Sequence, residues 1–309
     1  MVARYARRIL FIEFACYGVA ALLAHEFGLG WPAAAALVPA LAILVRVAAI
    51  GSTFVVASAL STAQERAQRS RRGRLRLVAA EIAWATLAYS VLMPFPRLAG
   101  RPDSRLPPAP GVMPVLLVHG YVCNSGIWAR MRRFLEAHGV PAYLHDLEPA
   151  YAGIDAYTEA LAARIEDVCA KTGARQLVIV THSMGGLATR ACLRAKGPGR
   201  VAKLITLGTG HHGTRSAPLG LGENARQMRP GSAWLEALAQ AESAAANGLV
   251  TSIYTGDDNV VVPAESAVLA GARNVRLTGI GHVSLAFSAE VQKIVLENVR
   301  AVRAVNVSV

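Results

Sequence analysis

The stretch QLVIVTHSMGGLATRA, residues 176–191, decides the fold of this chain. It begins with the apolar, β-branched run Gln176–Val180, continues with the pentad Thr181–Gly185, and ends in small residues with a helical pattern. We therefore expect a strand, a sharp turn at Ser183 and a helix. Such a turn lifts the serine hydroxyl above a sheet, and the start of the following helix favours negative charge beside it. Ser183 is thus a candidate nucleophile.

From Pro114 onward, strand patterns alternate with helical patterns such as Ile127–His138 and Ala156–Thr172. This alternation predicts a mostly parallel sheet with helices on both faces, in which ligands bind at the carboxyl ends of the strands. Ser183 lies at such an end. The six expected strands are Val115–His119, Ala142–Asp146, Leu177–Thr181, Lys203–Leu207, Ser252–Thr255 and Asn274–Leu277.

A serine hydroxyl needs a base within hydrogen-bond reach and a third group that orients the base. The family resemblance described below implies that the acid and then the base follow the nucleophile in the chain. His282 fits the base, because it comes just after the last strand in a glycine-flanked loop that can reach over the sheet. His211 and His212 adjoin the end of an earlier strand, where we expect them to shape a loop.

The acid is expected in the loop after the strand Ser252–Thr255, where Asp257 and Asp258 are adjacent. Both follow a strand end, so sequence physics alone does not separate them. The other member of the pair would be a solvated or loop-capping carboxylate.

The oxyanion formed during acyl transfer needs two fixed hydrogen-bond donors. The backbone N–H of Met184, directly after the nucleophile, is expected to be one donor. The other is the N–H of Tyr121, in the turn that Gly120 permits after the first strand. His119 precedes the nucleophile in the chain, and we therefore expect a structural role for it.

The first 95 residues are much more apolar than the rest. Three runs, 9–27, 31–60 and 77–95, each reach the length needed to cross a bilayer. Three such runs favour a retained anchor over a cleaved signal peptide or buried helices of a soluble domain. We therefore expect an all-helical transmembrane segment over 1–95, a proline-rich linker over 96–113 and a catalytic domain over 114–309.

The net charge of +12 is concentrated in the same region, where residues 1–110 hold 13 Lys and Arg against 5 Asp and Glu. The segment between the second and third apolar runs is short and rich in arginine. Because apolar runs flank it, the positive-inside rule indicates a cytoplasmic loop, not a nucleic-acid site. Three crossings from a cytoplasmic N-terminus place the catalytic domain on the periplasmic side of a bacterial inner membrane; two would keep it inside. The basic residues concerned are Arg4, Arg7 and Arg8 at the N-terminus and Arg66, Arg69, Arg71, Arg72, Arg74 and Arg76 in the loop, while Arg97, Arg101 and Arg105 after the third run oppose the outward placement.

Glu13, Arg46 and Glu81 lie in or near the apolar runs, and ionisable groups at membrane depth are usually paired. We expect an Arg–Glu pair between helices or snorkelling, in preference to a polar pathway.

The four cysteines lack zinc-type spacing. The long stretch Gly210–Gly248 has a helical second half, Ser232–Ala246, which either covers the substrate cleft or is an ordinary surface helix.

Four motifs, in the right order, resemble the bacterial lipases and esterases of the α/β-hydrolase fold, especially the small lidless triacylglycerol lipases. They are Pro114–Tyr121 (PVLLVHGY), Thr181–Gly186 (THSMGG), Thr251–Val262 (TSIYTGDDNVVV) and Ala272–Leu285 (ARNVRLTGIGHVSL). The resemblance covers about residues 112–300 and implies Asp258 as the acid, with no metal and no organic cofactor. Thr181 departs from the usual G-x-S-x-G pattern, and the long stretch after residue 210 departs from the lidless members.

Together these features predict a membrane-anchored serine hydrolase that cleaves carboxylic esters, with an ester or lipid substrate and the bilayer as partners. An acyltransferase would use the same residues and pass the acyl group to an alcohol or amine. A non-enzymatic membrane protein with a hydrolase-like domain is less favoured, because Ser183, Asp258 and His282 are all present.

Overall fold

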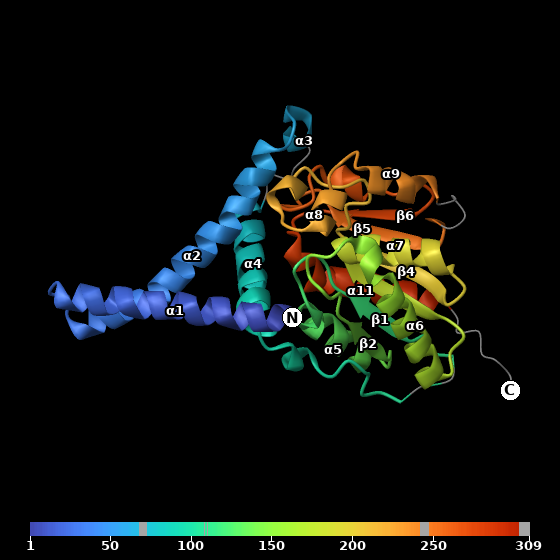
Figure 1. Ribbon diagram of the computed structural model, residues 1–309, viewed down its shortest axis with the longest axis horizontal. Coiled ribbons are helices and arrows are strands. Elements are labelled where there is room, and N and C mark those ends of the chain that lie inside the picture. Colours follow the sequence, from blue (N-terminus) through green and yellow to red (C-terminus); the bar gives the residue numbers. More distant parts are fainter. Residues whose placement is uncertain (68–72, 108, 110, 242–246, 303–309) are drawn as a thin grey trace.

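A six-stranded parallel sheet lies at the centre of the chain after residue 114 (Figure 1). The computed structural model describes residues 1–67, 73–107, 109, 111–241 and 247–302. Neighbouring strands pair in parallel in the order β2-β1-β3-β4-β5-β6. The six predicted strands are confirmed. They are β1 (Val115–Val118), β2 (Ala142–His145), β3 (Leu177–His182), β4 (Val201–Leu207), β5 (Val250–Thr255) and β6 (Arg273–Leu277).

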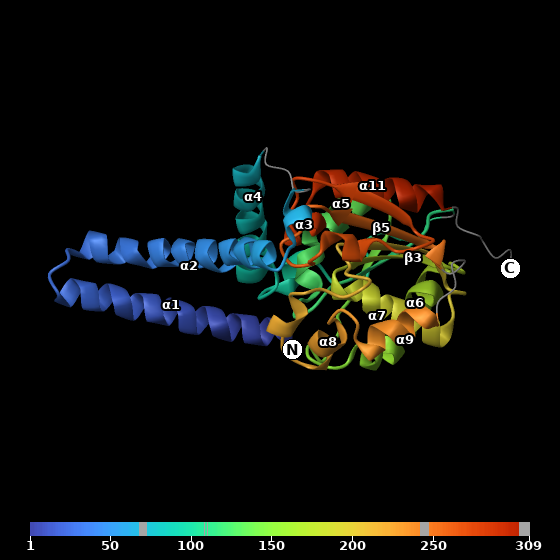
Figure 2. The same ribbon diagram turned by 90° about the horizontal axis from the view of Figure 1, so that it is seen from above.

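Helices cover both faces of the sheet, because central strands such as β1 and β3 are buried on both sides. In β1, Val115 and Leu117 pack into one hydrophobic core and Leu116 and Val118 into the other. Figure 2 shows the sheet between these two layers. One layer holds α5 (Ala129–Ala137) and α11 (Ala289–Ala301), and the other holds α6 (Thr158–Thr172) and α7 (Met184–Lys196).

Local signals set the ends of these helices. The Ser288 hydroxyl accepts the N–H of Val291 and caps the start of α11. Gly173, with φ 67°, ends α6 in the left-handed conformation that glycine adopts most easily. The predicted helical patterns at 127–138 and 156–172 correspond to α5 and α6, each preceded by a short 3-10 turn.

The stretch after residue 210 forms loops, α8 (Glu223–Gln227) and α9 (Ala233–Gln240). Leu235 and Leu238 of α9 belong to the core cluster that α7 also joins, and the Trp234 indole N–H donates to Asp155 at 2.6 Å. The helix expected at 232–246 is therefore an ordinary surface helix over its described part, and residues 242–246 lie outside the described residues.

The three N-terminal helices are long and apolar enough to cross a membrane: α1 (Val2–Glu26), α2 (Trp31–Ala59), and α4 (Arg74–Leu87) with its π-helical continuation Ala88–Leu92. α1 and α2 form a hairpin that extends away from the sheet (Figures 1 and 2). Glu13 and Arg46 pair across this hairpin, and the Arg46 Nε donates to Ser90 Oγ at 3.1 Å. The predicted Arg–Glu pair between helices is confirmed for these two residues.

The third apolar helix, α4, is directed crosswise to α1 in both views and lies against the sheet domain (Figures 1 and 2). Its Ala85, and Ala88 of the π-helical continuation, belong to the same hydrophobic core as one face of the sheet, and Trp84 stacks on Phe287 with ring centroids 5.0 Å apart. Glu81 is fully buried. The expectation that Glu81 pairs with arginine or snorkels is wrong, because its carboxylate accepts hydrogen bonds from the chain after residue 282.

The proline-rich segment runs along the domain surface. The Arg132 guanidinium donates to the carbonyl oxygens of Arg101 and Asp103, and the N–H of Leu144 donates to Pro102 O at 2.8 Å.

Of the basic cluster, Arg69, Arg71 and Arg72 lie outside the described residues. All four cysteines, at 16, 123, 169 and 192, are free.

Candidate active site

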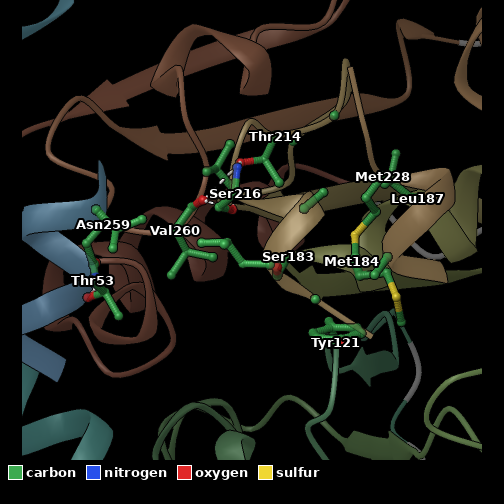
Figure 3. A pocket seen from close by; sticks show the side chains of 18 of the residues that line it. Thr53, Tyr121, Ser183, Met184, Leu187, Thr214, Ser216, Met228, Asn259 and Val260 are labelled. Atoms are coloured by element: carbon green, nitrogen blue, oxygen red, sulfur yellow. Dashed lines mark hydrogen bonds between the residues drawn. The ribbon is translucent and has the colours of Figure 1, made fainter. Parts of the chain in front are cut away.

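Ser183 joins β3 to α7 in a strained turn. Its φ of 54° and ψ of −128° are values that a side chain with a Cβ rarely adopts. Such strain costs on the order of 1–3 kcal/mol and persists where neighbours hold the backbone. Here the Ser183 N–H donates to Leu207 O at 2.9 Å, and the Thr209 hydroxyl donates to Ser183 O at 2.8 Å. The serine faces a cavity (Figure 3).

Glycines around the turn let neighbouring backbone approach it closely. A Cβ on Gly120 would lie 2.8 Å from the Cβ of Ser183. A Cβ on Gly185 would collide with the carbonyl oxygen of His119, and one on Gly186 with the side chain of Thr209. The glycines of the H-G-Y segment after β1 and of the M-G-G segment after Ser183 therefore serve the same close packing between these two segments.

The structure brings His282 and Asp258 together. Asp258 Oδ2 lies 2.9 Å from His282 Nδ1, and both side chains are buried. Asp258 Oδ1 accepts the N–H groups of Val260 at 2.8 Å and Val261 at 2.7 Å. Asp257 instead accepts the N–H of Gly279 at 2.7 Å. Of the two aspartates that the sequence left equal, Asp258 contacts the histidine, as the resemblance implied.

The charge state of His282 reflects two opposed effects. Burial lowers the pKa of the imidazole, but the negative charge of Asp258, its hydrogen bond to Nδ1, and the charge of Glu81 outweigh burial. The net effect raises the pKa of His282 above its ordinary value. The site is therefore arranged to accept a proton at this imidazole.

His182, which the sequence reasoning overlooked, links Ser183 to the His282 loop. Its Nε2–H donates to the carbonyl oxygen of His282 at 3.0 Å, and the two rings lie 4.7 Å apart. Burial, followed by the neighbouring His282, lowers the pKa of His182 to about 3, so it stays neutral. Because His182 directly precedes Ser183, this bond holds His282 against the turn.

The remaining histidines bind other groups. His119 Nδ1–H donates to Gly120 O at 2.9 Å and its Nε2 accepts the N–H of Leu147 at 2.9 Å, which supports the expected structural role. His211 contacts Arg190 and Thr206, and His212 Nε2–H donates to Val268 O at 3.0 Å. Among the described residues, no group of three or more His, Cys, Asp or Glu is arranged to hold a metal.

Tyr121 and Met184, the expected oxyanion donors, line the same cavity as Ser183 (Figure 3). The backbone N–H of Met184 opens α7, where amide groups lack helical partners. The Tyr121 hydroxyl exchanges hydrogen bonds with both the N–H and the carbonyl of Leu221, each at 2.7 Å. Val122, directly after Tyr121, has a φ of 48°, so this turn too is strained.

The cavity at Ser183 has a volume of about 370 Å³ and a mostly apolar wall. Part of that wall comes from the segment between Gly213 and Met228, and part from Ser52, Thr53 and Val56 of α2 (Figure 3). The first half of the stretch 210–248 therefore borders the cleft.

Asn259 ties α2 to the candidate base. Its Nδ2 donates to Thr53 Oγ1 at 2.7 Å, and its Oδ1 accepts the N–H of His282 at 2.9 Å. The sequence offers a weak signal for this residue, since it directly follows Asp258. Its partner Thr53 lies 206 positions away, where no local pattern points to it.

Known proteins resemble the region that contains this site. Residues 114–249 match the family model described as palmitoyl protein thioesterase. A triacylglycerol lipase of Burkholderia plantarii is 31% identical over 162 residues, which cover 48% of this chain and 44% of that protein. A triacylglycerol lipase of Pseudarthrobacter phenanthrenivorans is 33% identical over 112 residues, covering 34% and 35%.

Solved structures share the fold. A Bacillus licheniformis lipase in its mature form has a TM-score of 0.56 at 19% identity, with 62% of this chain and 94% of that chain covered. Aspergillus fumigatus lipase B has a TM-score of 0.55 at 18% identity, with 65% and 56% covered. These findings support the α/β-hydrolase family of lipases and esterases. The chain spans less than half the length of the two curated relatives it matches, and its α1, α2 and α4 precede the matched family region.

The close approach at Gly185 predicts a large effect of one added methyl group. Gly185→Ala forces a Cβ into the His119 carbonyl, and we expect it to lower the free energy of unfolding by about 1–3 kcal/mol. Gly199→Ala is the matched control, because nothing lies within 4 Å of its Cβ, and it should change stability by less than about 0.5 kcal/mol. Denaturant unfolding of the purified protein measures both. Equal stability of the two variants would contradict the packing described for the turn.

Proposed function

We propose that this chain is a membrane-anchored serine hydrolase that cleaves carboxylic esters through an acyl-enzyme on Ser183. The observation that carries the proposal is the buried His282–Asp258 pair beside a strained serine turn. The two triacylglycerol lipases that this chain resembles support the same chemistry.

Each group has one role in the reaction. The Ser183 hydroxyl attacks the ester carbonyl carbon and loses its proton to His282. Because Nδ1 of His282 is bonded to Asp258, Nε2 is the ring nitrogen that takes this proton. Asp258 holds the tautomer and stabilises the imidazolium, and the N–H groups of Tyr121 and Met184 bind the oxyanion. His282 then protonates the leaving alcohol.

Deacylation repeats these steps with water. His282 removes a proton from a water molecule, whose oxygen attacks the acyl carbonyl, and the acid product leaves as Ser183 regains its proton. An acyltransferase would replace water by an alcohol or amine, and product analysis with an added acceptor distinguishes the two. Since the matching family model is described as a thioesterase, thioesters belong in the same substrate panel.

Ser183→Ala tests the nucleophile. We expect it to lower kcat/KM for a short-chain chromogenic ester by at least about 10³-fold and to abolish labelling by a fluorophosphonate probe. Ser52→Ala is the control, because Ser52 also lines the cavity but its hydroxyl donates to Ala49 O of its own helix, at 2.8 Å. Ser52→Ala should keep both activity and labelling. A Ser183→Ala protein that still hydrolyses the ester at the wild-type rate refutes the proposed function.

The substrate proposed here carries a long acyl chain and comes from the bilayer. A second cavity of about 1230 Å³ lies between α1, α2, α4 and the domain, and it shares Tyr121, Leu219 and Gly220 with the cavity at Ser183. Its wall is largely apolar. The helices that form it expose apolar side chains such as Phe11 and Ile43 on their outer surface. An acyl chain esterified at Ser183 can therefore extend toward the membrane helices.

Filling this second cavity should discriminate between substrates. Ala49 of α2 lines it, and Ala49→Trp is expected to lower kcat/KM for a long-chain ester about tenfold or more, while leaving a short-chain ester unaffected. Ala48→Trp is the matched control, because Ala48 is exposed on the same helix and lies outside the described lining. The idea fails if the two variants have the same chain-length profile.

The membrane anchor proposed here is the α1–α2 hairpin. The 19-residue helix from Arg74 to Leu92 is about 28 Å long, so it spans an apolar layer of roughly 30 Å only when it is nearly upright. Because α4 is directed crosswise to α1 and packs into the domain core, the two helices cannot both be upright. This arrangement favours two crossings over the three that the sequence analysis preferred. It puts the domain on the cytoplasmic side, with Arg4, Arg7 and Arg8.

Protease treatment of spheroplasts tests this placement. With two crossings, the hydrolase domain should stay intact until the membrane is permeabilised, and it should sediment with membranes throughout. Digestion of the domain in sealed spheroplasts would instead establish three crossings and a periplasmic domain.

A further inference from the structure

We propose that Glu81 of α4 is a positioning residue for ester hydrolysis: its carboxylate holds the loop that carries His282 in place against Ser183 and Asp258. This inference rests on the proposed function and goes beyond it. It assigns a part of the active site to a helix that precedes the family match, which begins at residue 114.

The hydrogen bonds of the Glu81 carboxylate to the described part of the chain all go to the two residues that follow His282. Its Oε1 accepts the N–H of Val283 at 2.8 Å. Its Oε2 accepts the N–H of Ser284 at 2.9 Å and the Ser284 hydroxyl at 2.6 Å. These partners lie more than 200 positions away in the chain, so the contacts exist only in the folded molecule.

The site is built for a carboxylate. Glu81 is fully buried, and a buried carboxylate is tolerated where hydrogen-bond donors satisfy its oxygens, as the three donors do here. Gly281 makes room for it, because a Cβ at that position would collide with the Glu81 carboxylate. Conversely, without Glu81 the N–H groups of Val283 and Ser284 would be buried without these acceptors.

Glu81 completes a set of bonds that fixes the base from several sides. The backbone N–H of His282 is held by Asn259, its carbonyl oxygen by His182, and its Nδ1 by Asp258. Glu81 adds the two following amides and thereby prevents the loop from turning about His282. Even a small displacement of a catalytic group lowers the reaction rate strongly, because reacting atoms must lie close together and aligned.

Glu81 also acts through its charge. The charged and titratable groups around His282 are Asp258 from the loop after β5, His182 from the end of β3, and Glu81 from α4. His182 is neutral because its pKa is lowered to about 3 by burial and by His282. The negative charge of Glu81 therefore adds to that of Asp258 in favouring the imidazolium, and its loss should lower the pKa of His282.

Glu81→Gln in the full-length protein tests the inference, with kcat and KM for a short-chain ester measured across pH. We expect kcat to fall about 100-fold with little change in KM, because the amide cannot accept all three bonds. We also expect the acid limb of the profile to move to lower pH, since a base of lower pKa stays neutral further into acid. Glu81→Asp, which keeps the charge but loses reach, should lower kcat and leave the acid limb near its wild-type position.

Glu26→Gln is the matched control. It removes a carboxylate from the same N-terminal helices, at an exposed position of α1 that lines neither of the two cavities described above. We expect it to keep the wild-type pH profile. Ser284→Ala provides a second test if Glu81→Gln does not fold, because it removes only the hydroxyl bond to Glu81. It should give a smaller loss of kcat.

The outcomes separate this inference from the proposed function. If Ser183→Ala is inactive while Glu81→Gln and Ser284→Ala keep the wild-type kcat and acid limb, the positioning role is refuted and the hydrolase survives. A Glu81→Gln protein that melts earlier but has unchanged kcat and pH profile shows a structural role alone, which also overturns the inference. An active Ser183→Ala protein overturns the proposed function itself.

Discussion

The site depends on one constraint, the backbone of Ser183 held at φ 54° between β3 and α7. β3 ends and α7 begins on either side of Ser183. The backbone segments around this turn are so close together that some positions have no space for a side chain. Gly120, Gly185 and Gly186 meet that requirement. The Ser183 N–H, which donates to Leu207, and the Ser183 carbonyl oxygen, which accepts from the Thr209 hydroxyl, hold the strained conformation. The serine thereby faces the cavity above the sheet, where the loops after β1, β5 and β6 also converge.

Parallel pairing explains why those loops meet. All six strands run in one direction, so their carboxyl ends lie along one edge, and residues far apart in the chain become neighbours. The His282–Asp258 bond, the His182–His282 bond and the Asn259–His282 bond all form there. The base is held through its ring and through both polar groups of its backbone.

The N-terminal helices are part of this arrangement. Thr53 of α2 binds Asn259 and borders the cavity, and Arg215 pairs with Glu65 of the short helix α3 (Ala63–Ala67). α4 and its π-helical continuation contribute Ala85 and Ala88 to the core. Exposed apolar side chains on α1 and α2 suit a bilayer, whereas α4 buries its one carboxylate in the domain. A segment that composition presents as a simple anchor thus contributes walls and hydrogen bonds to the site.

Local pattern by itself determined the strands, the helices α5 and α6, the turn at Ser183 and the apolar character of the first 95 residues. Those features follow from periodicity and turn chemistry, which act over a few residues. The choice of Asp258 over Asp257 came from resemblance, and the bond to His282 shows why the two differ physically. Only the tertiary structure decided the partner of Glu81, the contact of Thr53 with Asn259 and the orientation of α4. Each joins segments far apart in the chain, and hydrophobicity alone cannot tell a helix face that meets lipid from one that meets protein.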